Sequence, residues 1–196
     1  MKRIRTLITM VAIFCLLLWV SAAVANNICL NKPLTYNGTF GGGTDGRAVD
    51  GIFMARGTQW QTGSLWWYTL SPNVVIDLQG LYTIDSMIVQ ADDNDAYRVE
   101  YWTGTAWQSA WEVPNYDAYG WGLQTRPNPD NNTEKYLLPS PITTDKLRFM
   151  ATSGDNCYSV SEIQAFGTLV PLPASVLLLG SGLAGLAGVR RWRSRP

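Results

Sequence analysis

The chain has 196 residues, with 15 Lys and Arg, 15 Asp and Glu and no histidine, so its formal net charge at neutral pH is zero. The absence of histidine excludes the Ser-His-Asp triad and the most common zinc ligand. Hydrophobic residues make up 46% of the chain, enough for one folded core of ordinary size.

The amino end has the three parts of a secretory signal peptide. Three cations within the first five residues precede an apolar stretch at 7–20, and the small residues Ala23-Val24-Ala25 follow it. This order predicts export and cleavage after Ala25, which removes residues 1–25 from the mature protein. The alternative is a retained N-terminal membrane anchor.

Two cysteines remain in the mature protein, Cys29 near its start and Cys157 near its end. Export to an oxidising compartment predicts a disulfide bridge between them, tying the first strand to the last. Closing a loop of about 128 residues would stabilise the fold by about 4–5 kcal/mol in the chain-entropy model. The alternative is two buried free thiols.

Short runs rich in β-branched and aromatic residues lie between the cysteines, separated by clusters of Gly, Pro, Asn and Asp. The expected strands are 74–78, 84–90, 97–102, 146–150 and 158–166. We find no amphipathic helix of useful length among them. Residues 26–169 are therefore predicted to form one all-β domain, an antiparallel jelly-roll β-sandwich.

Two segments between the expected strands carry groups of aromatic residues. The candidates for contact with a ligand are Trp66, Trp67 and Tyr68 in the first segment and Tyr116, Tyr119 and Trp121 in the second. Flat aromatic faces suit the C–H side of a sugar ring, and such rings are costly to expose without a partner. The alternative is that these side chains close the ends of a small hydrophobic core.

An acidic cluster, Asp92-Asp93-Asn94-Asp95, separates two of the expected strands. Asp92 and Asp95 are candidates for accepting hydrogen bonds from sugar hydroxyls or for holding a cation. The alternative is a solvated hairpin turn. A pair of carboxylates could serve glycoside hydrolysis. We nevertheless expect no catalysis.

The last 27 residues, 170–196, have the order of parts of an address signal. A proline motif leads into an uncharged apolar segment at 172–189, and arginines dominate the end of the chain. As a helix the apolar segment would be about 27 Å long, just short of a hydrocarbon core of about 30 Å. The motif consists of Val170, Pro171, Leu172, Pro173 and Ala174.

This tail resembles the PEP-CTERM sorting signal of Gram-negative bacteria, in its VPLPA variant. The resemblance implies a transient anchor in the inner membrane, processing by an exosortase, and a final location at the cell surface, the outer membrane or the extracellular matrix. Leu172 stands where the commonest form has Glu, so the exosortase subtype is left open. The alternative is an ordinary C-terminal membrane anchor.

Removing both ends changes the charge of what is exported. Eight cationic and 15 acidic side chains remain between the signal peptide and the tail, a net charge of −7. An acidic surface of this kind repels phosphate backbones and anionic lipid headgroups. Nucleic acid is therefore excluded as a partner.

The exported domain resembles the discoidin, or coagulation-factor C-type, domains of the galactose-binding-like β-sandwich superfamily from Cys29 to Gly167. The matching segments are Val49-Asp50-Gly51, Thr58-Gln59-Trp60, Val75-Ile76-Asp77-Leu78, Asp145-Lys146-Leu147-Arg148 and Ser161-Glu162-Ile163-Gln164-Ala165-Phe166-Gly167. The resemblance implies a non-catalytic module that binds glycans, lipid headgroups or proteins through loops at one end of the sandwich.

The family often holds a structural calcium ion near its first loops. Asp50, Thr58 and Glu162 match the positions of the family's calcium ligands, and backbone carbonyls near Arg47 and Arg56 would complete the shell of oxygen atoms. The alternatives are a turn-forming aspartate at Asp50 and a surface or ion-paired strand residue at Glu162.

These observations favour an exported, non-catalytic protein that binds carbohydrate, with exopolysaccharide as the expected partner and calcium fixing the loops. The first alternative is a structural surface or biofilm-matrix protein with protein partners. The second is a carboxylate-based glycoside hydrolase.

Overall fold

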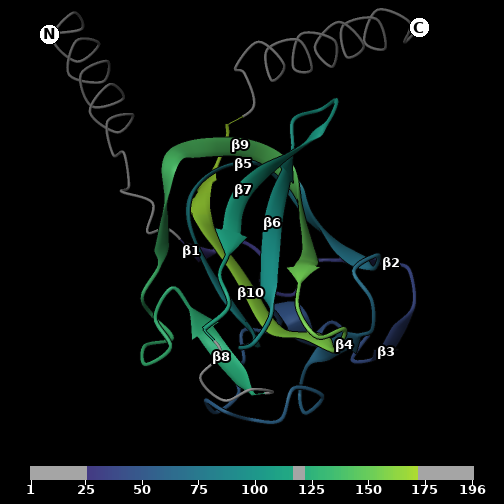
Figure 1. The fold of residues 1–196 in the computed structure, drawn as a ribbon. Helices are drawn as coiled ribbons and strands as arrows, with labels where there is room; N and C mark the ends of the chain where they lie inside the picture. The colour runs from purple at the N-terminus through teal and green to yellow at the C-terminus, as the bar shows by residue number, and fades with distance from the viewer. Residues whose placement is uncertain (1–25, 117–121, 172–196) are drawn as a thin grey trace, which may run out of the picture.

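The computed structural model describes residues 26–116 and 122–171, and these contain ten strands and one short 3-10 helix. Figure 1 shows them as a β-sandwich with almost no helix, which confirms the predicted fold class. The elements are β1 (Asn26–Asn27), β2 (Leu34–Asn37), β3 (Phe40–Gly42), η1 (Arg47–Val49), β4 (Leu65–Trp67), β5 (Asn73–Asp92), β6 (Ala96–Trp102), β7 (Trp107–Val113), β8 (Leu123–Arg126), β9 (Tyr136–Ser153) and β10 (Tyr158–Leu169). No helix in these two stretches is long and apolar enough to span a membrane.

Two long, bent strands join the layers of the sandwich. The first part of β5 pairs with β2 and with the second part of β9, whereas its second part pairs with β10 and β8. The register with β9 shifts between Asp77 and Tyr82, where Gln79 has a positive φ of 58°. The two strands predicted at 74–78 and 84–90 are therefore one strand with an irregularity where the sequence suggests a break.

The hydrophobic core lies between the layers and follows strand alternation. Val74, Ile76 and Leu78 are buried along the first part of β5 because side chains two apart face the same side. Further along, β5 and β10 are buried on both faces. The outer face is covered by the segment that follows η1, since the Gln90 side chain accepts a hydrogen bond from Met54 N (2.6 Å) and from Ser161 Oγ (2.7 Å).

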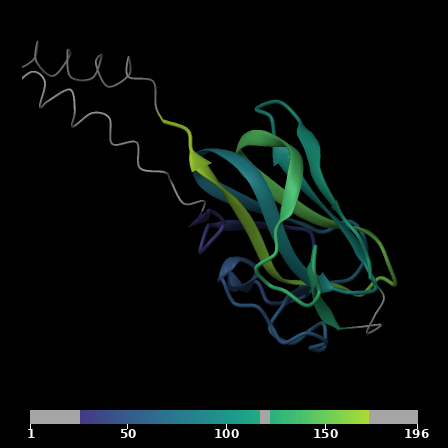
Figure 2. The same ribbon diagram turned by 90° about the vertical axis from the view of Figure 1, so that its left-hand side faces the viewer.

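The two ends of the described domain meet at one end of the sandwich. β1 pairs with the last part of β10, with Asn26 opposite Gly167, and Figure 2 shows these segments side by side. The first part of β10 lies at the opposite end, where Tyr158 pairs with Trp67. The acidic turn between β5 and β6 and the turn between β9 and β10 are at this second end, because Ala96 pairs with Ser153.

The predicted disulfide is wrong, because Cys29 and Cys157 are both free. The backbone N–H of Ile28 donates to Ala165 O (2.8 Å), so Cys29 lies beside the last part of β10, whereas Cys157 immediately precedes its first residue. At about 3.3 Å per residue the two are separated by roughly 26 Å along the strand, and a disulfide requires Cα atoms within about 7 Å. Burial raises the pKa of the Cys29 thiol to about 12, so this group is an inert part of the core.

Candidate functional site

Three aromatic side chains, Trp60, Trp66 and Tyr68, form an exposed cluster, which we call the aromatic platform. Their rings meet edge to face in all three pairs, with centroids 5.6 Å apart for Trp60–Trp66, 6.1 Å for Trp60–Tyr68 and 5.6 Å for Trp66–Tyr68. Tyr68 is 50% exposed, and both tryptophans are partly exposed. The platform therefore offers ring surface to a ligand on a preformed support.

Strand alternation and glycine place the platform. In β4, Leu65 and Trp67 point into the core and Trp66 points outward. The Trp66 ring lies directly on the backbone of β3, where a Cβ at Gly41 would come within 1.8 Å of it. Only glycine fits beneath this ring, so Gly41 and Gly42 of β3 allow Trp66 to pack directly on the backbone.

Trp67 is not a surface residue, which corrects its prediction as a ligand contact. It is 1% exposed, and its ring contacts Phe40 (5.6 Å), Tyr158 (6.0 Å), Tyr97 (6.2 Å) and Phe149 (6.4 Å). The alternative of core packing holds for this residue, because it has the inward position of the strand.

The acidic turn is buried, so the alternative of a solvated hairpin turn is wrong. Asp92 is 1% exposed and Asp95 is 0% exposed. Asp95 accepts hydrogen bonds from Tyr97 Oη (3.0 Å) and from Asp155 N (3.3 Å). The two carboxyl groups therefore support the turn from within.

Arg126 organises this end of the sandwich from its interior. The side chain is 0% exposed, and the five N–H groups of its guanidinium make six hydrogen bonds to main-chain carbonyl groups, one N–H of Nη2 being shared between two acceptors. The acceptors are Ala91 O (2.7 Å), Asp92 O (2.7 Å), Gln124 O (2.9 Å), Pro114 O (3.0 Å), Asp93 O (3.1 Å) and Asp95 O (3.4 Å). Arg126 therefore ties the acidic turn to β8 and to the end of β7.

Burial raises the pKa of three carboxyl groups. Desolvation raises the pKa of Asp92 to about 8, with the nearby Asp95 charge adding to it, and raises that of Asp95 to about 7. Desolvation likewise raises the pKa of Glu162 to about 8. Each group therefore binds its proton more tightly in the folded than in the unfolded chain, where carboxyl pKa values are about 4.

Stability is consequently expected to fall as the pH rises from about 5 to 8. The unfolded chain releases these protons near pH 4 and the folded chain only near pH 7–8, so alkali favours unfolding throughout this window. Chemical denaturation at several pH values measures how the free energy of unfolding changes with pH. Asp92→Asn should make this change smaller. A denaturation midpoint that rises from pH 5 to 8 would contradict the raised pKa values.

Of the remaining aromatic candidates, only Tyr116 lies within the described residues. Tyr116 is 39% exposed, donates its hydroxyl to Pro127 O (2.5 Å) and lies over the Arg126 guanidinium at 5.5 Å. Tyr116 is thus part of the support around Arg126. Tyr119 and Trp121 lie outside the described residues, as do residues 1–25 and, in the sorting motif, Leu172, Pro173 and Ala174.

Two of the three predicted calcium ligands lie near one another. Glu162 is 0% exposed and accepts hydrogen bonds from Gly51 N and Gln164 Nε2 (both 3.1 Å), and the charge of Asp50 contributes to its raised pKa. Thr58 lies against β8 instead, where Leu123 N donates to its carbonyl (2.7 Å) and its hydroxyl donates to Ala55 O (2.6 Å). Within the two described stretches, no three acidic or thiol side chains form a cluster that could hold a metal ion.

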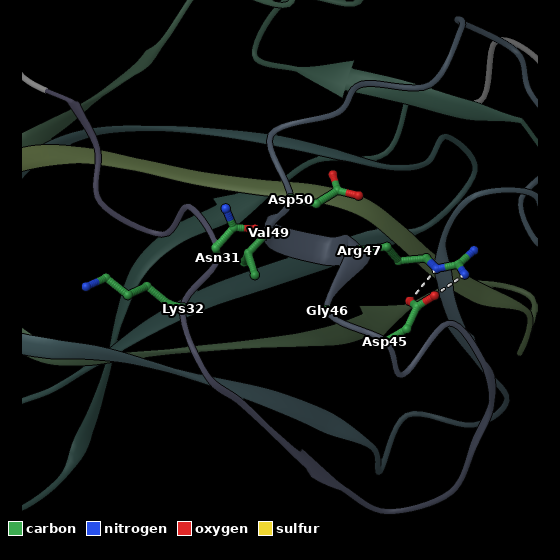
Figure 3. A pocket seen from close by; sticks show the side chains of 7 residues that line it. All are labelled: Asn31, Lys32, Asp45, Gly46, Arg47, Val49 and Asp50. Carbon is green, nitrogen blue, oxygen red and sulfur yellow. Dashed lines mark hydrogen bonds and ion pairs between the residues drawn. The ribbon is translucent and has the colours of Figure 1, made fainter.

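A polar cavity of about 280 Å³ adjoins Asp50. Figure 3 shows Arg47 turned toward Asp45, with which it forms an ion pair, while the Asp50 carboxylate points away from that pair. The lining residues are Asn31, Lys32, Asp45, Gly46, Arg47, Val49 and Asp50. The Asp50 oxygen that accepts from Ile52 N (2.8 Å) keeps its carboxylate fixed at the edge of this cavity.

Known proteins match this chain in structure and not in sequence. No protein-family model matches it, and no curated protein is a significant match. A chitosan-binding module from a Paenibacillus sp. IK-5 chitosanase/glucanase superposes with a TM-score of 0.51 at 18% identity, covering 72% of this chain and 99% of that one.

Two solved structures from Streptococcus pneumoniae are similar to the same extent. A fucose-binding module has a TM-score of 0.51 at 15% identity, covering 74% of this chain and 96% of that one. The family 32 carbohydrate-binding module of EndoD has a TM-score of 0.50 at 15% identity, covering 73% and 100%. At these identities the likeness shows the fold alone, an antiparallel β-sandwich shared with these modules.

Proposed function

We propose that this domain is a non-catalytic carbohydrate-binding module that holds a polysaccharide on the aromatic platform. The observation that carries the proposal is an exposed cluster of three aromatic rings that packs on the glycines of β3. The cluster lies at the end of the sandwich far from the ends of the described domain. Modules of the same fold from Paenibacillus and Streptococcus pneumoniae bind chitosan and fucose, which supports a glycan as the partner.

The test is binding of the full-length chain in detergent to a glycan array and to purified exopolysaccharide, measured by titration calorimetry. Tyr68→Ala is expected to weaken binding about tenfold, because it removes an exposed ring worth about 1.4 kcal/mol against a sugar face. Tyr82→Ala serves as the matched control at the other end of the sandwich. Binding that survives Tyr68→Ala, or absence of binding to any glycan, would contradict the proposal.

The proposal includes export and surface location. An exosortase would process the tail after transient anchoring in the inner membrane, leaving the domain at the cell surface, the outer membrane or in the extracellular matrix. The support is the order of motif, apolar segment and arginine-rich end in the sequence. Separating cell fractions from strains with and without the exosortase tests it, since only the latter should retain the uncut chain in the inner membrane.

We also propose that a calcium ion stabilises the domain through Asp50 and Glu162. Glu162 forms no ion pair with any described Lys or Arg, and its carboxylate is buried beside a second acidic residue. A bound divalent cation would replace the proton that the raised pKa of Glu162 retains at neutral pH, whereas Thr58 lies beside β8 and is not placed to assist.

Calcium at millimolar concentration is therefore expected to raise the melting temperature over that in chelator, because a ligand selective for the folded state stabilises it. Asp50→Asn should abolish this rise. Asp85→Asn makes the same charge change at an exposed site and should preserve it. An identical melting temperature with calcium and with chelator would rule the ion out.

A further inference from the structure

The charged side chains of the domain are distributed unevenly. The segments 57–73, 90–97 and 149–162 surround the aromatic platform and contain no Lys or Arg. The acidic residues in these segments are Asp92, Asp93, Asp95, Asp155 and Glu162. The raised pKa values of Asp92, Asp95 and Glu162 leave these buried groups substantially protonated at neutral pH, so the negative potential beside the platform rests mainly on the exposed Asp155.

The buried cation at this end, Arg126, offsets part of the charge of the acidic turn, because it interacts electrostatically with Asp92 and Asp93. All six hydrogen bonds described for the Arg126 guanidinium go to main-chain carbonyls, so this single charge is used to pin the backbone. Asp155 is exposed, and no described Lys or Arg forms an ion pair with it. Tyr158 pairs with Trp67 in antiparallel register, which places the turn containing Asp155 beside the strand end that leads to Tyr68.

A buried hydroxyl next to the platform has no partner in the described protein. Ser159 is 0% exposed, and its Oγ makes no hydrogen bond. Ser159 pairs with Trp66, so the two side chains share the outer face of the sheet. Val160 pairs with Ala91, which puts Asp92 next in register on that same face. The Ser159 hydroxyl is therefore a buried polar group beneath the platform whose hydrogen-bonding capacity the described protein leaves unused.

We infer that the platform selects glycans that carry free amino groups over neutral or anionic glycans with the same backbone. This inference rests on the glycan binding proposed above and names its substrate class. An ammonium group beside an aromatic face gains a cation–π contact, and the exposed Asp155 adds electrostatic attraction. A uronate or sulfate polymer meets the same field as repulsion.

The test compares three oligosaccharides with the full-length chain in detergent by titration calorimetry. They are a β-1,4-linked glucosamine hexamer, its N-acetylated counterpart, and an oligogalacturonate. The glucosamine hexamer is expected to bind about tenfold more tightly than the acetylated one at low salt, and the gap should narrow in 0.5 M NaCl because screening weakens exposed charges. The oligogalacturonate should bind most weakly.

Two variants separate charge from stacking. Asp155→Asn should reduce the preference for the amino sugar and leave binding of the acetylated hexamer unchanged, whereas Tyr68→Ala should weaken both. Equal or tighter binding of the acetylated hexamer, still sensitive to Tyr68→Ala, would overturn the inference while the glycan-binding proposal stands. Absence of binding to every oligosaccharide, with the protein folded, would overturn both.

Discussion

Replacing Arg126 by methionine should destabilise the domain by about 3–5 kcal/mol, because it removes the donor from several buried carbonyl groups at once. Methionine keeps most of the side-chain volume but offers no donor. The carbonyl groups of Ala91, Asp92 and Gln124, among others, would then be buried without a partner. Unpaired buried groups cost about 1–3 kcal/mol each, less whatever water can satisfy. Urea unfolding followed by fluorescence measures the loss.

A matched control is Arg98→Met on the outer surface of β6. Its side chain is 37% exposed and donates to Glu112 at 2.6 Å, so its loss is expected to cost less than about 1 kcal/mol. Arg126→Lys should rescue only part of the stability, because the three donors of an ammonium group cannot serve six carbonyl acceptors. If Arg126→Met behaved like Arg98→Met, the role assigned to the guanidinium would be refuted.

The second large effect is expected for Trp67→Ala, at about 3–5 kcal/mol. The substitution removes the ring that packs against Phe40, Tyr97, Phe149 and Tyr158 and leaves a cavity between the two layers. Trp67→Phe should cost less because it keeps an aromatic ring in the same place. Chemical unfolding with near-ultraviolet circular dichroism reports both the stability and the packing.

The neighbouring Tyr68→Ala is the control for Trp67→Ala, since the two residues are adjacent in the chain but differ in exposure, at 1% and 50%. It should cost less than about 1 kcal/mol in stability while weakening glycan binding. A Tyr68→Ala variant as unstable as Trp67→Ala would show that the platform is a structural cluster and not a contact surface.

The sequence was sufficient to predict the class of fold, because the alternation of apolar and polar side chains along a strand is a local pattern. The buried positions of β5 appear as apolar alternation, and β10, which is buried from Tyr158 to Gly167, appears as a continuous strand-like run. The runs at 107–113 and 136–145 were missed, since Pro139 and Pro141 within β9 read as a loop. Whether 74–78 and 84–90 form one strand or two depends on pairing partners far away in the sequence.

The site was predicted only in part, for the same reason. Trp66 and Tyr68 were identified by type, but Trp60 was not among the candidates, and its ring contacts with Trp66 and Tyr68 show that it completes the platform. Alternation within β4 would have separated Trp66 from Trp67. Nothing local distinguishes Arg126 from a surface arginine, because its six acceptors come from three separate segments.

The position of β10 has a mechanical consequence. Its first residues pair with β4 beneath the platform, it pairs with β5 along most of its length, and its last residue, Leu169, leads to the C-terminal segment. A pull between a ligand on the platform and the C-terminal end would therefore run parallel to the strand. The hydrogen bonds to β5 would be loaded together in shear and not opened one by one. β10 would therefore carry the load, and the domain could transmit force along this strand without a covalent cross-link.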